Sequence, residues 1–175
     1  LSAFLQSSNA ENWNAIVPSE RLLLYATAIQ TGLRAGEIRS LTKRNLFFDR
    51  KPPFIVAKAA GTKNRKDARQ YIKDDLAIAL REHASKGHNG TNVFCLPRPD
   101  QMAEMLRDDM AGARASWLAE VRADDEEHER RQNSEILMDP NQAGERLDFH
   151  SLRHTCGAWL AMTGAHPKAV QTVMR

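Results

Sequence analysis

The chain has few of the features that mark secreted, metal-binding or membrane proteins. Its only two cysteines, Cys95 and Cys156, are far apart in the sequence and match no metal-ligand spacing. No apolar run is long enough to cross a bilayer, and polar residues interrupt the first segment too early for a signal peptide. We therefore expect a reduced, cytoplasmic protein that has no membrane partner and no disulfide framework.

The chain also lacks a large net charge, but the distribution of its charges is more informative than the total of +3. The stretch from Arg34 to Lys73 carries twelve basic and three acidic side chains, whereas acidic residues gather between Glu120 and Glu129. A protein that places one face on a polyanion needs such polarity, because neutralised phosphates release condensed counterions. A solvated basic loop would show the same pattern, so charge alone leaves both interpretations open.

Hydrophobic periodicity predicts a mainly α-helical fold with a small sheet, an α+β arrangement. Two β runs at 54–57 and 68–72 flank a turn-like segment and predict an antiparallel hairpin or three-stranded sheet at one edge. With 42% apolar residues the chain can bury a core, so we expect one domain of residues 1–175. Helices are expected at residues 18–30, from 34 onward, at 74–85, 100–113 and 114–131, and from 167 onward.

The most informative segment runs from Leu147 to Thr163. Asp148 is a natural N-cap for a helix, and Gly164 can take the left-handed backbone that ends one. His150 and Arg153 share a face near the start of this helix, where an imidazole and a guanidinium could bind an anion. On its own such a pair is more often an ordinary surface pair. A neighbouring buried stripe is predicted from five apolar residues at steps of three and four: Phe149, Leu152, Cys156, Trp159 and Leu160.

Two motifs, in this order along the chain, resemble the tyrosine recombinases of the phage integrase family. The first is similar to the family's first arginine motif and reads Thr31-Gly-Leu-Arg34-Ala-Gly-Glu37-Ile38. The second is similar to its His-x-x-Arg-His box and reads His150-Ser-Leu-Arg153-His154-Thr155. The resemblance implies the helical catalytic domain of these enzymes with a small β-hairpin at one edge. It also implies site-specific recombination or integration of double-stranded DNA, by strand cleavage and rejoining through a 3′-phosphotyrosine intermediate.

The resemblance also implies roles for the residues of both motifs. Arg34 and Arg153 would clamp the non-bridging oxygens of the scissile phosphate, and His150 would assist proton transfer with the nucleophile. Glu37 would orient Arg34, although a weak surface salt bridge is the alternative, and His154 would give supporting packing or hydrogen bonds. Because arginines and a lysine do the work of a cation here, we expect no metal and no cofactor.

The hairpin between the motifs carries the lysine that protonates the leaving 5′ oxygen in this family. Counted back from the end of the second strand, Lys63 matches this position. Lys58 and Lys66 remain rivals, because one sequence does not fix the register of a hairpin. A basic loop that touches DNA without chemistry is the alternative. Further contacts with the DNA backbone are expected from Lys43, Arg44, Arg65, Lys66 and Arg69.

The family pattern places a further His or Trp, and then the tyrosine nucleophile, downstream of the helix that begins near Pro167. The only tyrosines of the sequence are Tyr25 and Tyr71, and neither matches the position of the nucleophile. A DNA-clamping domain normally precedes the catalytic domain, and it too is outside these residues. We therefore expect a truncated catalytic domain that does not cleave DNA by itself, and a homotetramer on DNA for the full-length protein.

Three alternatives stay open. One is a DNA-binding regulator without a nucleophile, which would need the basic hairpin but not the intact Arg-Lys-His-Arg set. The second is a type IB topoisomerase, which relaxes supercoils by related chemistry. The third, a helical scaffold with no nucleic-acid role, would make both motif matches accidental.

Overall fold

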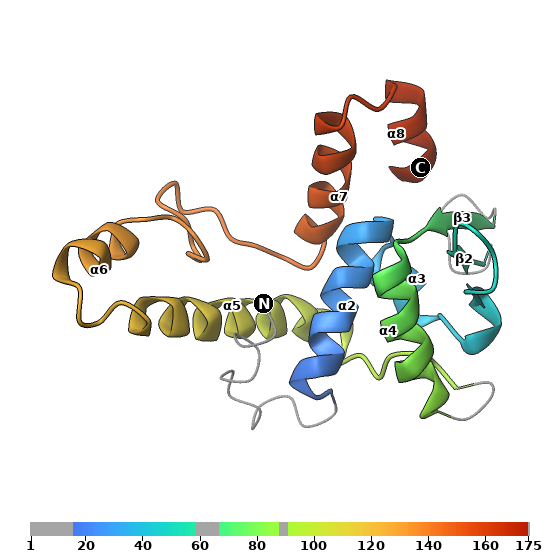
Figure 1. The fold of residues 1–175 in the computed structure, drawn as a ribbon, viewed down its shortest axis with the longest axis horizontal. Helices are drawn as coiled ribbons and strands as arrows, with labels where there is room; N and C mark the ends of the chain where they lie inside the picture. Colours follow the sequence, from blue (N-terminus) through green and yellow to red (C-terminus); the bar gives the residue numbers. More distant parts are fainter. Residues whose placement is uncertain (1–15, 59–66, 88–90, 175) are drawn as a thin grey trace. The chain divides into compact units, whose positions relative to one another are not determined.

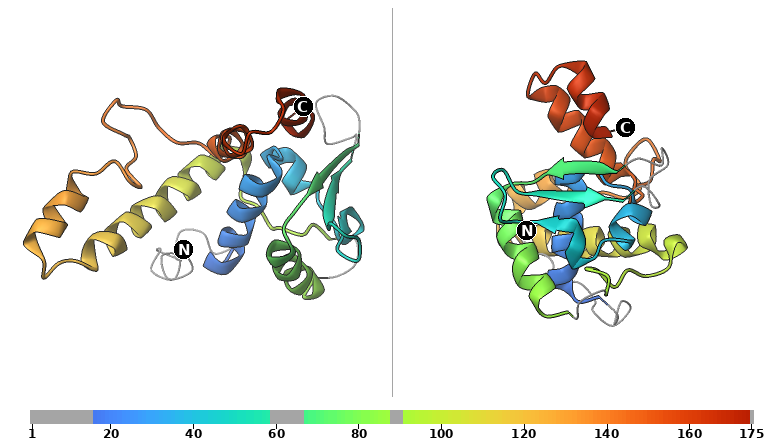
Figure 2. Two further views of the ribbon diagram at one scale, coloured as in Figure 1. Left: turned by 45° about the horizontal axis from the view of Figure 1, so that its top comes forward. Right: turned by 90° about the vertical axis from the view of Figure 1, so that its right-hand side faces the viewer.

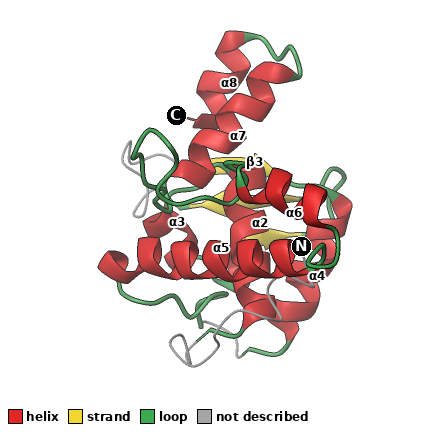
Figure 3. Cartoon of the chain, turned by 90° about the vertical axis from the view of Figure 1, so that its left-hand side faces the viewer, coloured by secondary structure: helices red, strands yellow, loops and turns green. Residues whose placement is uncertain are grey.

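The computed structural model describes residues 16–58, 67–87 and 91–174 (Figure 1). Helices predominate and the sheet is small (Figure 3), which confirms the fold class expected from the sequence. The strands are β1 (Leu46–Phe47), β2 (Phe54–Ala57) and β3 (Ala68–Tyr71). The α-helices of the described residues are α2 (Pro18–Thr31), α3 (Ala35–Arg39), α4 (Asp74–Ser85), α5 (Met102–Ala119), α6 (Asp125–Gln132), α7 (Ser151–Met162) and α8 (Pro167–Met174).

The chain divides into two compact units, and the first comprises Leu1–Leu22 with Pro97–Phe149. This unit is built on α5, whose buried side chains form one helical stripe: Met102, Met105, Leu106, Asp109 and Ala113. Asp109 is the charged member, and its carboxylate accepts hydrogen bonds of 2.8 and 2.9 Å from the guanidinium of Arg21. A third N–H of Arg21 donates to the Ile16 carbonyl at 2.8 Å, so both buried charges have partners.

The acidic segment after α5 forms a helix of its own. The chain turns back between α5 and α6 (Figure 1), so the helix expected over residues 114–131 is interrupted. No residue of α6 is buried. Its Arg131 guanidinium binds the Glu127 carboxylate at 2.8 Å and the Trp117 carbonyl of α5 at 2.6 Å, and it lies over the Trp117 ring. Polar contacts with α5, and not a buried apolar face, hold this helix in place.

The second unit, Leu23–Leu96 with His150–Arg175, contains the sheet. Its strands run in the order β1-β2-β3 with both pairs antiparallel (Figure 2). β2 and β3 are the expected hairpin strands, and Phe54 pairs with Tyr71 across them. Side chains alternate on β3, so Ala68 and Gln70 are buried while Arg69 and Tyr71 are exposed. Residues 59–66, between these strands, lie outside the described part of the chain.

Helix α4 and the segment after it close the core of this unit. One face of α4 is buried through Leu76, Ala77, Leu80 and Ala84. The His83 ring stacks on Phe94 with 5.5 Å between centroids, and its Nε2 lies 2.7 Å from the Val93 carbonyl. The N-cap of α4 is Lys73, and neither Asp74 nor Asp75 caps this helix. The two aspartates lie in the first turn instead, where their charge favours the helix dipole.

Helices α7 and α8 lie side by side (Figures 1 and 2). Gly164 has a φ of +75° between them and ends α7, as expected. The expected N-cap at Asp148 is wrong: residues 149–150 form a turn, and the His150 carbonyl accepts the first helical bonds, from Arg153 N at 2.9 Å and His154 N at 3.3 Å. The predicted apolar stripe is also only partly buried, since Trp159 is 56% exposed.

Candidate phosphate-binding site

The first arginine motif forms a tight turn between α2 and α3. Thr31 ends α2, and its hydroxyl accepts a hydrogen bond from Leu33 N at 3.2 Å. Gly32 has a φ of +60°, a conformation that glycine adopts without steric cost. Arg34 is then the N-cap residue of α3. The turn therefore places Arg34 at the very start of a helix.

Glu37 holds Arg34 by two hydrogen bonds. One carboxylate oxygen accepts from the Arg34 backbone N–H at 2.9 Å, and the other accepts from the guanidinium at 3.1 Å. The Glu37 side chain is fully buried, while the Arg34 side chain keeps 29% of its surface exposed. A carboxylate buried in this way fixes the arginine far more firmly than a solvated surface pair does.

Arg153 lies on α7 and is 94% buried, since only 6% of its surface is exposed. Its guanidinium donates a hydrogen bond to the Gly32 carbonyl, 121 positions earlier in the chain. The neighbouring Cys156 thiol lies 3.8 Å from the Gln30 carbonyl at the end of α2. The second motif is thereby attached to the turn that carries Arg34, so the structure brings the two arginine motifs together.

The two histidines of the second motif are exposed at the start of α7. His150 is the N-cap residue, one turn before Arg153. The His154 ring meets the His150 ring edge to face, with 4.9 Å between centroids and 85° between planes. His150 therefore lies at the helix N-terminus, where the backbone N–H groups favour an anion, and His154 supports it by direct ring contact.

Gly32 is closely packed between the two motifs and Met174, which was not foreseen from the sequence. A Cβ placed on Gly32 would lie 3.2 Å from the Met174 sulfur and 3.3 Å from the Cys156 sulfur. Burial raises the pKa of the Cys156 thiol, and the positive charge of Arg153 opposes this in part. The glycine of the Thr-Gly-Leu-Arg motif was the available signal, because such a residue can mark a close approach as well as a turn.

The structure describes some of the basic hairpin residues named in the sequence analysis and does not describe the others. Lys63, Arg65 and Lys66 lie outside the described residues, so the structure does not place them. Lys58 is exposed after β2 and pairs with Asp67 at 3.0 Å. Arg69 lies on the outward face of β3 with its guanidinium 4.4 Å from the centre of the Phe54 ring.

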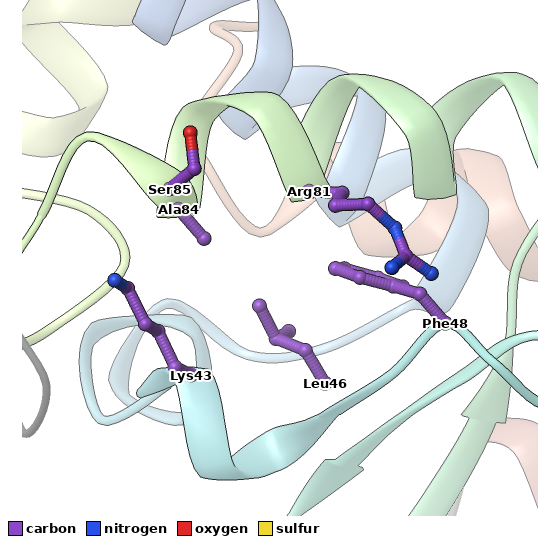
Figure 4. Close-up of a pocket in the computed structure, with 6 residues that line it drawn as sticks. All are labelled: Lys43, Leu46, Phe48, Arg81, Ala84 and Ser85. Atoms are coloured by element: carbon purple, nitrogen blue, oxygen red, sulfur yellow. The ribbon is translucent and has the colours of Figure 1, made fainter.

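Lys43 and Arg44 lie in the 3₁₀ turn η2 (Lys43–Asn45) before the sheet. Arg44 is exposed, whereas the Lys43 ammonium donates to the Gly87 carbonyl at 2.6 Å. Lys43 also lines a groove of about 250 Å³ (Figure 4). Arg81 lies at the other end of that groove and binds Asp49 at 2.9 Å. The groove is basic at both ends, over an apolar floor that includes Leu46 and Phe48.

Over residues 16–58, 67–87 and 91–174, no group of three or more His, Cys, Asp or Glu side chains is arranged to hold a metal ion. Among the helices of the same residues, none combines the length and apolar content that a bilayer crossing requires. The side chains of the candidate site are those of two arginines, a buried glutamate and two histidines.

Comparison with known proteins identifies a family for this chain and solved structures with a similar fold. The model of the phage integrase family matches residues 4–175. No curated protein matches the chain. Among solved structures, XerA recombinase is similar with a TM-score of 0.61 and 14% identity, over 98% of this chain and 52% of that one.

The Tn1549 transposon integrase in complex with circular intermediate DNA is similar to the same degree. Its TM-score is 0.61 at 16% identity, over 98% of this chain and 55% of that one. At such identities the likeness shows the fold. The chain spans about half the length of the solved structures that it matches.

Proposed function

The chain belongs to the phage integrase family, and on this premise we propose that residues 1–175 are part of the catalytic domain of a tyrosine recombinase, without the segment that carries the nucleophile. The proposed activity is site-specific DNA recombination by strand cleavage and rejoining. The observation that carries the proposal is the hydrogen bond from the Arg153 guanidinium to the Gly32 carbonyl. It attaches one arginine motif to the other, as a shared phosphate would require.

In this proposal Arg34 and Arg153 bind the non-bridging oxygens of one DNA phosphate. A guanidinium offers five N–H donors in a rigid fork, so one can bind the protein while others face a phosphate oxygen. The Arg153 guanidinium donates to the Gly32 carbonyl, and the Arg34 guanidinium donates to the buried Glu37. Both charges would thus be in place before negative charge develops at phosphorus, which is how fixed donors lower such barriers.

The remaining steps need proton transfers. A tyrosine oxygen would attack phosphorus and form the 3′-phosphotyrosine bond, while the P–O5′ bond breaks and the 5′ oxygen takes a proton from Lys63. His150, exposed at the N-terminus of α7, would take part in the transfer of the tyrosine proton. Tyr25 is buried on α2 and Tyr71 lies on the outward face of β3, and we assign the nucleophile to neither.

The proposed partner is double-stranded DNA, and the proposed assembly of the active enzyme is a homotetramer on its recombination site. The Tn1549 integrase was solved with DNA, and the net basic stretch from Arg34 to Lys73 supports the same partner here. Arg44 and Arg69 are exposed in this stretch and would contact the backbone. Such contacts carry no sequence information but position the protein on the duplex.

A titration of the 175-residue chain with a fluorescent 30-base-pair duplex, followed by anisotropy at several salt concentrations, tests this proposal. Wild type should bind with a strong salt dependence, because each neutralised phosphate adds about 0.9 to the slope. Arg34→Ala should weaken binding by roughly tenfold or more, as expected for loss of a charge-assisted bond of about 1.5–3 kcal/mol. Arg98→Ala is the matched control, since Arg98 is an exposed arginine outside the basic stretch.

The outcomes separate the candidate functions. If Arg34→Ala and Arg98→Ala weaken binding equally, the phosphate clamp is wrong. The chemistry is then tested with a duplex whose nick, close to the cleaved phosphate, would trap a covalent adduct between protein and DNA. The product is analysed on a denaturing gel. We expect the 175-residue polypeptide to bind this duplex without a covalent adduct. An adduct abolished by Tyr71→Phe would overturn our view of the nucleophile.

A further inference from the structure

Three aromatic rings form one row across the outward face of the sheet. Phe47 pairs with Phe54, and Phe54 pairs with Tyr71, along the strand order β1-β2-β3. Residues directly opposite one another on antiparallel strands share a face, so the three side chains lie on the same side. The Phe47 and Phe54 rings stack with 4.8 Å between centroids and 16° between planes, and the Tyr71 ring meets Phe54 edge to face at 5.9 Å. The rings therefore form one continuous aromatic surface.

The two ends of this aromatic row are exposed, whereas its middle is covered. Phe54 is 9% exposed, but Phe47 is 37% exposed and Tyr71 is 55% exposed. The solvated face of an antiparallel sheet ordinarily carries polar side chains. Scattered single apolar residues on a surface are common, whereas a contiguous patch of large rings is typical of a binding surface.

Basic side chains lie beside the aromatic row. The Arg69 guanidinium lies 4.4 Å from the centre of the Phe54 ring, so a cation covers the middle of the row. Arg50 and Lys51 are exposed in the connection between β1 and β2. A guanidinium can lie over a ring and also bind a phosphate, because its five N–H donors point outward in one plane. The outward face of the sheet thus combines rings for stacking with cations for phosphates.

We propose that the aromatic row and Arg69 form a binding site for single-stranded DNA. Unpaired bases stack on the exposed parts of Phe47 and Tyr71, and Arg69 binds a neighbouring phosphate. Rings and basic groups are the two elements that sequence-independent binding of single strands requires. A duplex cannot use the rings in this way, because its base faces are covered by the adjacent base pairs. The sheet also lies within the basic stretch from Arg34 to Lys73, which favours a polyanion over an apolar protein surface.

The direct test compares two strands of about 20 nucleotides that differ only in their bases: oligothymidylate and an abasic strand with the same number of phosphates. Both carry a fluorescent label and are titrated with the wild-type 175-residue chain at several salt concentrations. The salt slopes should be alike, because the same phosphates are neutralised. Oligothymidylate should bind about five- to twentyfold more tightly at fixed salt, as expected when a base stacks on an aromatic ring. Equal affinities for the two strands would overturn the proposal.

Variants then locate the stacking through the ratio of the two affinities, which is insensitive to a general loss of folded protein. Combining Phe47→Ala with Tyr71→Ala should lower the preference for oligothymidylate to less than about twofold. Tyr71→Phe keeps the ring and should retain the preference. Ile78→Ala is the matched control, because Ile78 is a 68% exposed apolar residue on α4 of the same unit. A preference that persists without the two rings would contradict the site.

This site goes beyond the proposed function and does not depend on the arginine clamp. Arg34→Ala should therefore weaken both single strands by the same factor and leave their ratio unchanged, even if the clamp on duplex DNA is wrong. The double aromatic variant should change the affinity for the 30-base-pair duplex by less than about twofold. Equal losses for duplex and oligothymidylate would show that the rings serve the fold of the sheet. A change in oligomeric state by light scattering, with the preference for bases intact, would show a protein interface instead and would also overturn the proposal.

Discussion

Replacing Gly32 with alanine tests whether the arginine turn depends on its contacts with α7 and α8. The added methyl group meets the Met174 and Cys156 sulfurs at 3.2 and 3.3 Å, at a residue with a φ of +60°. A positive φ costs a non-glycine residue about 1–2 kcal/mol, and overpacking costs about 1–3 kcal/mol more. We therefore expect Gly32→Ala to lower the free energy of unfolding by about 2–5 kcal/mol, and the melting temperature by roughly 5–15 °C.

Urea unfolding followed by circular dichroism measures the loss, and Gly36→Ala is the control. Gly36 lies four residues further on, inside α3, and a Cβ there meets no atom within 4 Å. That variant should gain up to about 1 kcal/mol, because alanine is the better helix former. Adding Met174→Ala to Gly32→Ala should return only part of the packing cost, since the Cys156 sulfur and the positive φ remain.

The same variant should also bind DNA more weakly, because the Gly32 carbonyl is the acceptor for the Arg153 guanidinium. A loss of about tenfold at fixed salt would correspond to one displaced charge-assisted bond. If Gly32→Ala is as stable as wild type and binds DNA equally well, the close packing does not position the arginines, and the reasoning fails.

Three further predictions concern groups other than Arg34 and Arg153. Arg21→Met leaves the Asp109 carboxylate buried without its partner and should lower the free energy of unfolding in urea by about 3–5 kcal/mol. Adding Asp109→Leu to this variant should recover most of the loss. If the single and the double variant lose the same stability, the buried pair is contradicted. Hydrogen bonds from the two arginines that follow it on α6 lower the pKa of Glu127 from 4.5 to about 2. Its contribution to stability is thus fully present above the ordinary pKa and is lost progressively as pH falls from 4.5 through about 2. A midpoint near 4.5 in a carboxyl NMR titration would refute the contacts. Burial raises the pKa of Cys156, so a maleimide at pH 7 should label Cys95 alone in the native chain and both thiols in urea, as read by intact mass.

Local sequence signals predicted the elements of the site well. The helices that flank the arginine turn, the two hairpin strands and the helix that begins at Pro167 all follow from apolar periodicity and glycine or proline signals. The boundaries of the helices were predicted less accurately. Asp148 has the better capping side chain, yet α7 begins after His150, because the Phe149–His150 turn precedes the first helical hydrogen bonds.

Long-range partners were beyond the sequence for a physical reason. Periodicity gives the face of a helix but not what covers it, so Trp159 of the predicted stripe is 56% exposed while Arg21, a charged residue, is fully buried. The Gly32–Arg153 bond and the hydrogen bond from the Gln70 amide to the Val173 carbonyl span 121 and 103 positions. No local pattern encodes such pairs. A polar residue at an inward strand position was the only hint that Gln70 has a distant acceptor.

The site is best understood through what its arginines would lose on binding. An exposed arginine such as Arg44 must give up side-chain freedom to bind a phosphate, at a cost of about 0.5–1.5 kcal/mol. Arg153 is buried on Gly32 and Arg34 is held by the buried Glu37, so both have met this cost on folding. Exposed arginines and the two held arginines should therefore contribute to DNA binding in different ways. Exposed cations should set mainly the salt slope, whereas Arg34 and Arg153 should contribute more affinity per released counterion.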